Sequence, residues 1–150
     1  MTAEAIITNA GVPWTILRAT QFYDLLDMAM RFAAKFPVAF LPTDFLLQPV
    51  DSGEVAEALC QAVASAPAGR LPDMGGPAVR RAGDLARAWL KARGLRRLII
   101  PLRLPGKIGH GFRSGYNTCP QHRQGKVTWT EWLAQTSQVS ANPQVVGART

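Results

Sequence analysis

The spacing of apolar residues predicts alternating strands and helices in the first half of the chain. Residues 12–17 form a nearly continuous apolar and β-branched run, which is typical of a parallel strand covered on both faces. Apolar residues then recur every three or four positions over residues 21–35, which predicts an amphipathic helix. A short strand over 45–50 leads into a second helix, with Asp51 as its cap and Glu54 three positions later. This order of elements indicates an α/β fold.

The second half of the chain is less regular and richer in helix. We expect Asp84 to cap a helix that stops near Gly94, residues 98–100 to form a short strand, and Thr128 to cap a last turn. Residues 101–112 leave the choice between helix and loop open. Few large apolar residues follow position 133, so we predict a folded portion over 1–133 and a disordered tail over 134–150. A parallel sheet of two or three strands would expose an unpaired edge, which suggests additional sequence upstream.

Composition places the chain among globular proteins. Of its 150 residues, 47% are apolar and 18% are charged. No apolar run approaches the roughly 20 residues that a membrane span needs, and no basic leader precedes an apolar core, so we predict no membrane contact and no secretion signal. Cys60 and Cys119 are far apart, and Cys60 falls near the apolar side of a predicted helix, which favours a buried thiol. A cytoplasmic location is consistent with these features.

The net charge of +7 is unevenly distributed along the chain. Residues 1–79 hold four basic and eight acidic side chains, whereas residues 80–126 hold twelve basic side chains and the single acid Asp84. Such a block is either a solvated face or a surface for an acidic protein partner. It carries no recognised nucleic-acid motif, and we predict no specific nucleic-acid binding.

Other constellations that could support chemistry are incomplete. Cys119 and His122 have the spacing of half a zinc site, but no second pair of ligands is present, so we predict no metal. The histidines and serines do not suggest a nucleophilic triad. Asp24 and Asp27 share a helix face, and we expect that face to be solvated.

Four segments, in order, resemble atypical short-chain dehydrogenase-like proteins of the NmrA and sugar-epimerase-like type. The first is residues 11–22, GVPWTILRATQF. Residues 48–56 (QPVDSGEVA) resemble the short strand and Asp-capped helix of that family, and residues 73–89 begin with DMGGP and continue into the next helix. Residues 125–133, with GKVTW and EWL, resemble its closing segment.

The resemblance implies the C-terminal half of a Rossmann-like, doubly wound parallel sheet with a helix-rich substrate-side region. It further implies NAD or NADP as cofactor and a small-molecule substrate that the sequence does not identify. The positions that would line the cleft beside the cofactor are Arg18, Ala19, Thr20, Gln21 and Phe22. Ligands in such folds bind outside the carboxyl ends of the parallel strands, which agrees with this placement. The alternative is that Arg18 and Phe22 only close a strand–helix joint.

The chain departs from this family at two functional elements. The glycine-rich loop that holds the cofactor's pyrophosphate has no counterpart here, and neither Tyr23 nor Tyr116 has a lysine four residues later. In the family both elements precede the segment that Glu4 matches, so we predict no catalytic residue. Three functions stay open: a partial oxidoreductase or epimerase-like protein, a non-enzymatic NmrA-like regulatory or binding protein, and an inactive truncated product. Whether the chain is an enzyme is therefore undecided from its sequence.

Overall fold

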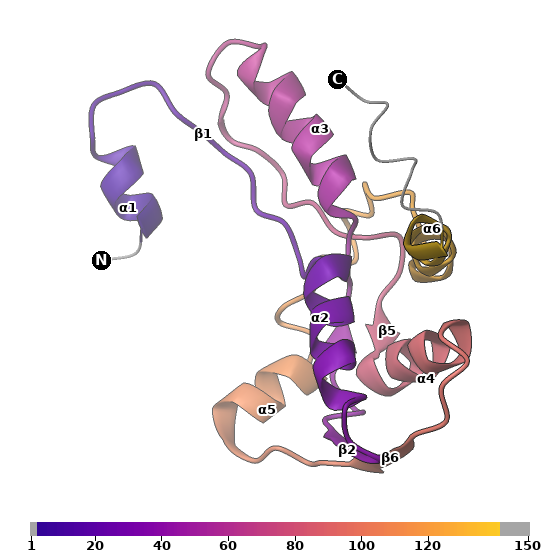
Figure 1. Cartoon of the computed structure of the whole chain (residues 1–150). Helices are drawn as coiled ribbons and strands as arrows, with labels where there is room; N and C mark the ends of the chain where they lie inside the picture. Colours follow the sequence, from indigo (N-terminus) through magenta and orange to yellow (C-terminus); the bar gives the residue numbers. More distant parts are fainter. Residues whose placement is uncertain (1–2, 142–150) are drawn as a thin grey trace.

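A computed structural model describes residues 3–141 and shows a mixed α/β architecture (Figure 1). The helices are α1 (Ala3–Thr8), α2 (Tyr23–Ala33), α3 (Ser52–Val63), α4 (Ala82–Ala92), α5 (Gly106–Arg113) and α6 (Trp129–Ala141). The strands are β1 (Thr15–Ile16), β2 (Val38–Leu41), β3 (Leu46–Leu47), β4 (Gly69–Arg70), β5 (Arg80–Arg81) and β6 (Leu98–Pro101). The predicted α/β class is confirmed.

Within the described residues the strands pair two by two. β1 pairs with β4 and β2 pairs with β6, both in parallel, whereas β3 and β5 are antiparallel. A parallel bridge between Ala19 and Met74 extends the β1–β4 pair. The strand predicted over 12–17 is thus shorter than expected and only half-buried, because β1 has a partner strand along one edge alone in this part of the chain.

The main hydrophobic core joins α2, α4 and α6. Trp89 of α4 and Trp129 and Trp132 of α6 are buried against Tyr23 of α2, and the rings of Trp129 and Trp132 are stacked at 5.4 Å between centroids. A second, smaller cluster consists of Val50, Val55 and Met74, beside the β1–β4 pair. The molecule therefore has a large core beneath its helices and a small one under its parallel strands.

Two of the three predicted helix caps are confirmed. Asp51 Oδ2 accepts a hydrogen bond from the Glu54 N–H at 3.2 Å, and Thr128 Oγ1 accepts one from the Glu131 N–H at 3.3 Å. The prediction for Asp84 was wrong, because α4 already begins at Ala82. Its first N–H groups donate to the carbonyl oxygens of Phe45 and Thr43, so backbone acceptors from a distant segment replace the side-chain cap.

Helix α6 continues to Ala141, eight residues into the segment predicted as a tail. In its middle turns the Ser137 hydroxyl donates to the Leu133 carbonyl at 2.8 Å. A polar side chain that bonds to the carbonyl four positions earlier can lie within a helix without ending it. Residues 142–150 of the predicted tail lie outside the described residues.

The thiol of Cys60 is exposed, and the prediction that it is buried was wrong. Helix α3 buries Val55 in its first turn, but Leu59 and Val63 further along the same helix are exposed. Ala58 still packs against the small core cluster, but Leu59 and Cys60 lie on the exposed side of the helix.

Candidate functional site

An open cleft of about 390 Å³ lies at the carboxyl ends of β1 and β4. One wall consists of residues 18–21, which follow β1, together with Asp73, which follows β4. The other wall is the loop of residues 116–119, which follows α5. The parallel pairing of β1 and β4 places the first two segments at the same edge, where ligands bind in open parallel sheets.

Arg18 lies at the rim of the cleft and forms an ion pair with Glu4 of α1. The Arg18 guanidinium donates two hydrogen bonds to the Glu4 carboxylate and holds the pKa of that carboxyl below its usual value. Arg70 of β4 joins the group through Asp73, at 3.1 Å, and lies 3.9 Å from Glu4. Arg18 thus ties α1 to the strand–helix joint while about half of its side chain stays exposed.

Gln21 connects the two walls of the cleft, and Thr20 attaches its own wall to Gln48 behind it. The Gln21 amide nitrogen donates to the Asn117 carbonyl at 2.9 Å, and its amide oxygen accepts from the Gln48 N–H at 3.1 Å. The Thr20 hydroxyl donates to the Gln48 carbonyl. The Gln21 side chain therefore fixes the loop of residues 116–119 against the joint after β1.

Four of the five predicted site residues line the cleft, namely Arg18, Ala19, Thr20 and Gln21. Phe22 is not among the lining residues. Its backbone forms a parallel bridge with Val50, which places it at the joint between β1 and α2. Phe22 thus adjoins the residues that line the cleft and lies at the strand–helix joint itself.

Gln48 is the central buried polar residue behind the cleft, and the sequence reasoning missed it. Its side chain is fully buried, donates to the Gly76 carbonyl at 2.9 Å and accepts from the Cys119 N–H at 2.8 Å. The only local signal was a glutamine inside the otherwise apolar stretch 45–50. A buried amide with satisfied hydrogen bonds holds three chain segments in one arrangement.

Gly75, Gly76 and Gly109 allow close packing between segments of the chain. Gly75 and Gly76 approach Gln48 and Pro49 so closely that a Cβ on Gly76 would lie 1.7 Å from the Pro49 carbonyl oxygen. Gly109 of α5 packs in the same way against the Leu104 carbonyl. These glycines allow close contact within the chain itself, whereas a cradle for a dinucleotide's pyrophosphate needs a loop whose N–H groups point to a ligand at a helix start.

The two tyrosines differ in their surroundings. The Tyr23 hydroxyl donates to the Val127 carbonyl at 2.8 Å, and burial, with the nearby Glu54 and Asp51 carboxylates, raises its pKa well above the usual value. Tyr116 lines the cleft and is 82% exposed. Tyr23 is therefore committed to the core, and Tyr116 is the tyrosine that a ligand in the cleft could reach.

Cys119 and His122 lie near the cleft. Burial raises the pKa of the Cys119 thiol, which lies 3.9 Å from the His122 carbonyl oxygen. Among residues 3–141, no three His, Cys, Asp or Glu side chains come together in a way that could hold a metal ion.

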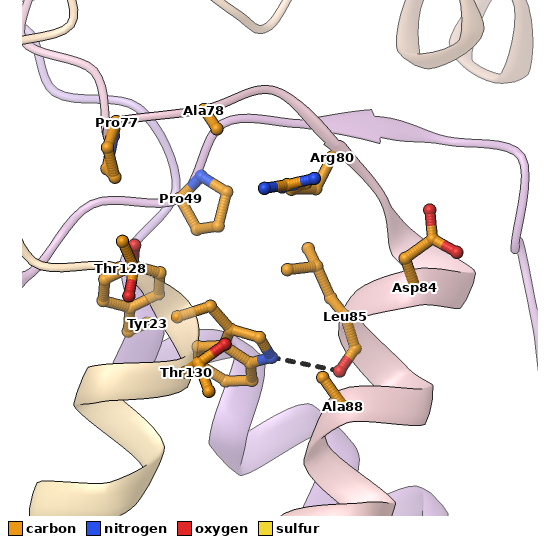
Figure 2. A pocket seen from close by; sticks show the side chains of 11 residues that line it. Tyr23, Pro49, Pro77, Ala78, Arg80, Asp84, Leu85, Ala88, Thr128 and Thr130 are labelled. Atoms are coloured by element: carbon orange, nitrogen blue, oxygen red, sulfur yellow. Dashed lines mark hydrogen bonds between the residues drawn. The ribbon is translucent and has the colours of Figure 1, made fainter.

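A second pocket of about 250 Å³ lies between α2, α4 and the start of α6 (Figure 2). Leu85, Trp129 and Pro49 form apolar walls, and Arg80 and Asp84 lie at one side. The Trp129 indole N–H donates to the Leu85 carbonyl at 3.0 Å, which locks the ring in place. No pattern in the sequence indicates this pocket.

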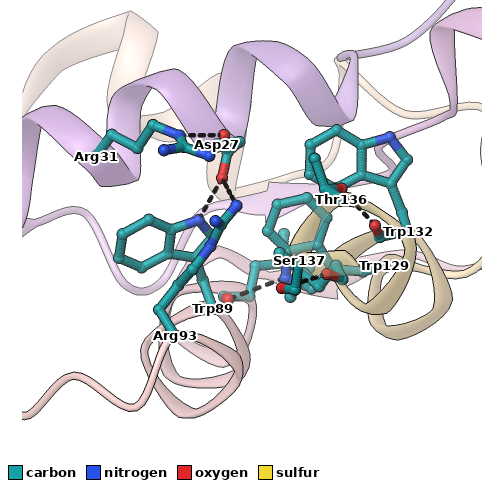
Figure 3. A network of polar contacts seen from close by, with 10 residues as sticks. Asp27, Arg31, Trp89, Arg93, Trp129, Trp132, Thr136 and Ser137 are labelled. Carbon is teal, nitrogen blue, oxygen red and sulfur yellow. Dashed lines mark hydrogen bonds and ion pairs between the residues drawn. The ribbon is translucent and has the colours of Figure 1, made fainter. Parts of the chain in front are cut away.

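Asp27 is buried in a polar network, so the prediction of a solvated face was wrong for this residue (Figure 3). It accepts hydrogen bonds from the Trp89 indole at 2.6 Å and from Arg93 at 2.9 Å, and it also pairs with Arg31. Helix α4 covers this turn of α2 and brings the two donors from more than sixty positions away. Asp24 remains exposed and accepts from the Ser52 hydroxyl.

The chain matches no model of a known protein family and no curated protein sequence. Solved structures share its fold. An NADPH-dependent quinone oxidoreductase from Escherichia coli has a TM-score of 0.69 at 15% identity, over 89% of this chain and 58% of that one. A nucleoside-diphosphate-sugar epimerase from Staphylococcus aureus has a TM-score of 0.63 at 13% identity, over 87% and 55%.

A UDP-glucose 4-epimerase from Thermus thermophilus, solved with NAD, has a TM-score of 0.62 at 18% identity, over 92% of this chain and 50% of that one. The fold is Rossmann-like. The chain spans about half the length of these structures. At these identities the likeness shows the fold alone. None of the described helices is both long and apolar enough to cross a membrane.

Proposed function

We propose that this chain forms the substrate side of the cleft in an NAD(P)-dependent oxidoreductase or epimerase-like protein of the atypical short-chain dehydrogenase type. The observation that carries the proposal is the cleft itself, in which residues 18–21 and 116–119 face each other at the carboxyl ends of two parallel strands. The similar structures include proteins described as NADPH-dependent or solved with NAD, and their folds match this chain over about half their length.

Under this proposal, two different parts of a protein would bind the two ends of the cofactor. Residues 18–21 would lie beside the nicotinamide end, where Gln21 and Asn117 keep the walls in register. We expect the pyrophosphate to be held by residues other than 3–141, because Gly76 and Gly109 are packed against the carbonyl groups of Pro49 and Leu104. The cofactor would be NAD or NADP, and the substrate would be a small molecule. The free thiols of Cys60 and Cys119 are consistent with a reducing cytoplasm.

Amide chemical shifts of the isotopically labelled chain test this division of the cofactor. We expect reduced nicotinamide mononucleotide to shift the amides of Ala19, Gln21 and Thr118, and 5′-AMP to leave them unchanged. We also expect NADPH to give no saturable rise in melting temperature, since such a rise requires tight binding to the folded state.

A matched pair of exposed residues provides the control. Tyr116→Ala removes an 82% exposed cleft side chain, and Val63→Ala removes an 84% exposed side chain on α3. The first change should weaken the nicotinamide-dependent shifts, and the second should leave them as in the parent chain. Shifts that are absent, or that Val63→Ala alters as strongly as Tyr116→Ala, would refute the proposal.

A non-enzymatic NmrA-like binding protein is the second candidate, favoured by the engagement of the Tyr23 hydroxyl in the core. Its sign would be a salt-sensitive complex with an acidic protein through the basic segment 80–126. Arg96 and Arg97 are exposed and suit this test, whereas Arg93 is tied to Asp27 and does not. If Arg96→Gln and Arg97→Gln left the affinity and its salt dependence unchanged, the basic segment would have no such role.

The mass of the polypeptide in its own cells separates the oxidoreductase or epimerase-like candidate from the binding protein and from an inactive truncated product. A mass greater by on the order of a hundred residues, roughly one mononucleotide-binding half, would support the oxidoreductase or epimerase-like proposal. A mass equal to that of the 150 residues would favour the binding protein or the inactive product.

A further inference from the structure

The strands β2 and β6 form a small parallel sheet with two different faces. The register pairs Val38 with Leu98 and Phe40 with Ile100, so these four side chains share one face. Ala39, Leu41 and Ile99 lie on the opposite face and pack into or against the main core. Among residues 3–141 no element covers the outer apolar face, and Phe40 and Leu98 are 62% and 61% exposed.

Exposed apolar side chains continue beyond the strands. Leu102 directly follows β6 and is exposed, as is Ile108 in α5. We call the outer residues of β2 and β6, together with Leu102, the apolar cap; its members are Val38, Phe40, Leu98, Ile100 and Leu102. Large apolar side chains gathered on one exposed face generally mark a contact surface.

The segments that carry the apolar cap are basic and contain no acid. Residues 35–41 and 96–108 hold five basic side chains and no Asp or Glu. All five are exposed: Lys35, Arg96, Arg97, Arg103 and Lys107. The Arg97 guanidinium donates to the Ala34 carbonyl at 3.1 Å, which places it at the end of α2 next to Lys35. The apolar cap is thus flanked by positive charge at both ends of its strands.

The rest of a Rossmann-like sheet would not cover this face. An added strand would pair with the free edge of β1, and β1 lies at the opposite end of the molecule from β2 and β6 (Figure 1). A second copy of the chain would bring ten like charges around one contact, which opposes association. The occupant must combine negative charge with a surface that accepts protruding apolar side chains.

We propose that the apolar cap binds the surface of a lipid bilayer that contains anionic phospholipids. Phe40, Leu98 and Leu102 would enter the boundary between headgroups and acyl chains while the five cations contact the phosphates. The sequence predicted no membrane partner because β2 and β6 are about sixty positions apart and neither is apolar enough by itself. Their pairing creates the surface, and no membrane-spanning segment is required.

Sedimentation with lipid vesicles tests the proposal on the complete chain. We expect binding to phosphatidylcholine vesicles with roughly one third phosphatidylglycerol, weaker binding at high salt, and little binding to phosphatidylcholine alone. Arg96→Gln with Arg103→Gln should lower the partition coefficient about 30-fold, since each cation near an anionic surface contributes a factor of about five. Phe40→Ser with Leu98→Ser should lower it by about tenfold or more.

Matched variants at the other end of the molecule serve as controls. Arg123→Gln with Lys126→Gln removes the same charge, and Leu59→Ser with Val63→Ser removes exposed apolar side chains from α3. Both should bind as the parent chain does. Hydrogen exchange on the unaltered chain adds a readout without variants: anionic vesicles should protect the amides of residues 38–41, 98–100 and 102 and leave those of Gly69 and Arg70 unchanged.

Several results would overturn the proposal. Absence of binding, equal binding to both vesicle types, or parent-like binding by the Phe40 and Leu98 variant would each do so. A lipid-free dimer that the same two changes abolish would make the apolar cap a self-association surface. If the chain bound a soluble acidic peptide but not vesicles, and the Arg96/Arg103 and Phe40/Leu98 variants lost that binding, the partner would be a protein.

Discussion

At the scale of single residues, Gln48 shows how a buried polar group can determine the shape of a cleft. Its side chain links Gly76, after β4, to Cys119 in the opposite wall. Gln48→Leu keeps the side-chain volume but leaves the Gly76 carbonyl and the Cys119 N–H without their partner. We expect this change to lower the free energy of unfolding, measured in urea, by about 2–4 kcal/mol. Gln61→Leu on the exposed side of α3 is the control, with an expected change below about 0.5 kcal/mol.

Asp27 makes stability depend on pH. Burial raises the pKa of Asp27, but hydrogen bonds from Trp89 and Arg31 and the charges of Arg31 and Arg93 outweigh it, so the pKa is lowered in the folded chain. A lowered carboxyl pKa stabilises the fold above the unfolded value of about 3.9, and this stability is lost as pH falls through the folded pKa.

Asp27→Asn should therefore cost about 3 kcal/mol at neutral pH, because it leaves Arg93 in a partly buried site without its anion. The difference between the two chains should shrink as the pH falls below about 4 and through the lowered pKa of Asp27, because the Asp27 carboxyl of the parent chain then becomes neutral as well. Urea unfolding at a series of pH values measures both effects. A difference between the two chains that stays constant from neutral to acid pH would show that Asp27 is not the titrating group.

At the scale of elements, Glu54 attaches α3 to the segment that enters α6. Its Oε1 accepts from the N–H of Lys126 at 2.8 Å and from that of Val127 at 3.3 Å. We expect Glu54→Ala to cost about 1.5–3 kcal/mol, as for hydrogen bonds to a charged group, and to speed hydrogen exchange at Lys126 and Val127. Glu57→Ala, on the same helix and exposed, should change neither; equal effects of both substitutions would mean that helix propensity is responsible.

The elements that the sequence predicted well are those fixed by neighbouring residues. The Asp51 and Thr128 caps depend on contacts three positions away, and both are confirmed. The start of α4 depends instead on the carbonyls of Phe45 and Thr43, and the prediction at Asp84 failed. The burial of Asp27 likewise depends on Trp89, sixty-two positions away. Local patterns contain no information about such partners.

At the scale of the whole molecule, one wall of the cleft could be predicted from local sequence and the other could not, because contacts between distant segments leave no local pattern. The wall of residues 18–21 follows a recognisable strand, and four of the five predicted residues line the cleft. The opposite wall comes from residues 116–119, which Gln21 contacts across ninety-six positions, and nothing in the local sequence indicates that contact. The apolar cap was missed for the same reason, since β2 and β6 acquire a common face only when they pair.

The two cores of the molecule should differ in stability. Among the residues that the structure describes, the main core has twelve buried members, whereas the cluster beside β1 and β4 has three. The segment around β4 donates hydrogen bonds to the carbonyls of Trp14, Ile16 and Arg18. Because successive residues of a strand point their backbone groups to opposite sides, the amides of Thr15 and Leu17 point away from β4. On that side β1 has no partner strand among residues 3–141. These two amides should exchange fast, and those of Leu85 and Trp89 in α4 should exchange slowly.

The same measurement on a longer natural polypeptide would connect this edge to the proposed function. If a further strand of the Rossmann-like sheet pairs with β1, Thr15 and Leu17 should gain protection there, because their N–H groups would then have carbonyl partners. The amides of α4 serve as an internal reference, since the main core is complete without that strand. Slow exchange at Thr15 and Leu17 in the 150-residue chain itself would instead show that the edge is already covered, and the need for another half of the sheet would disappear.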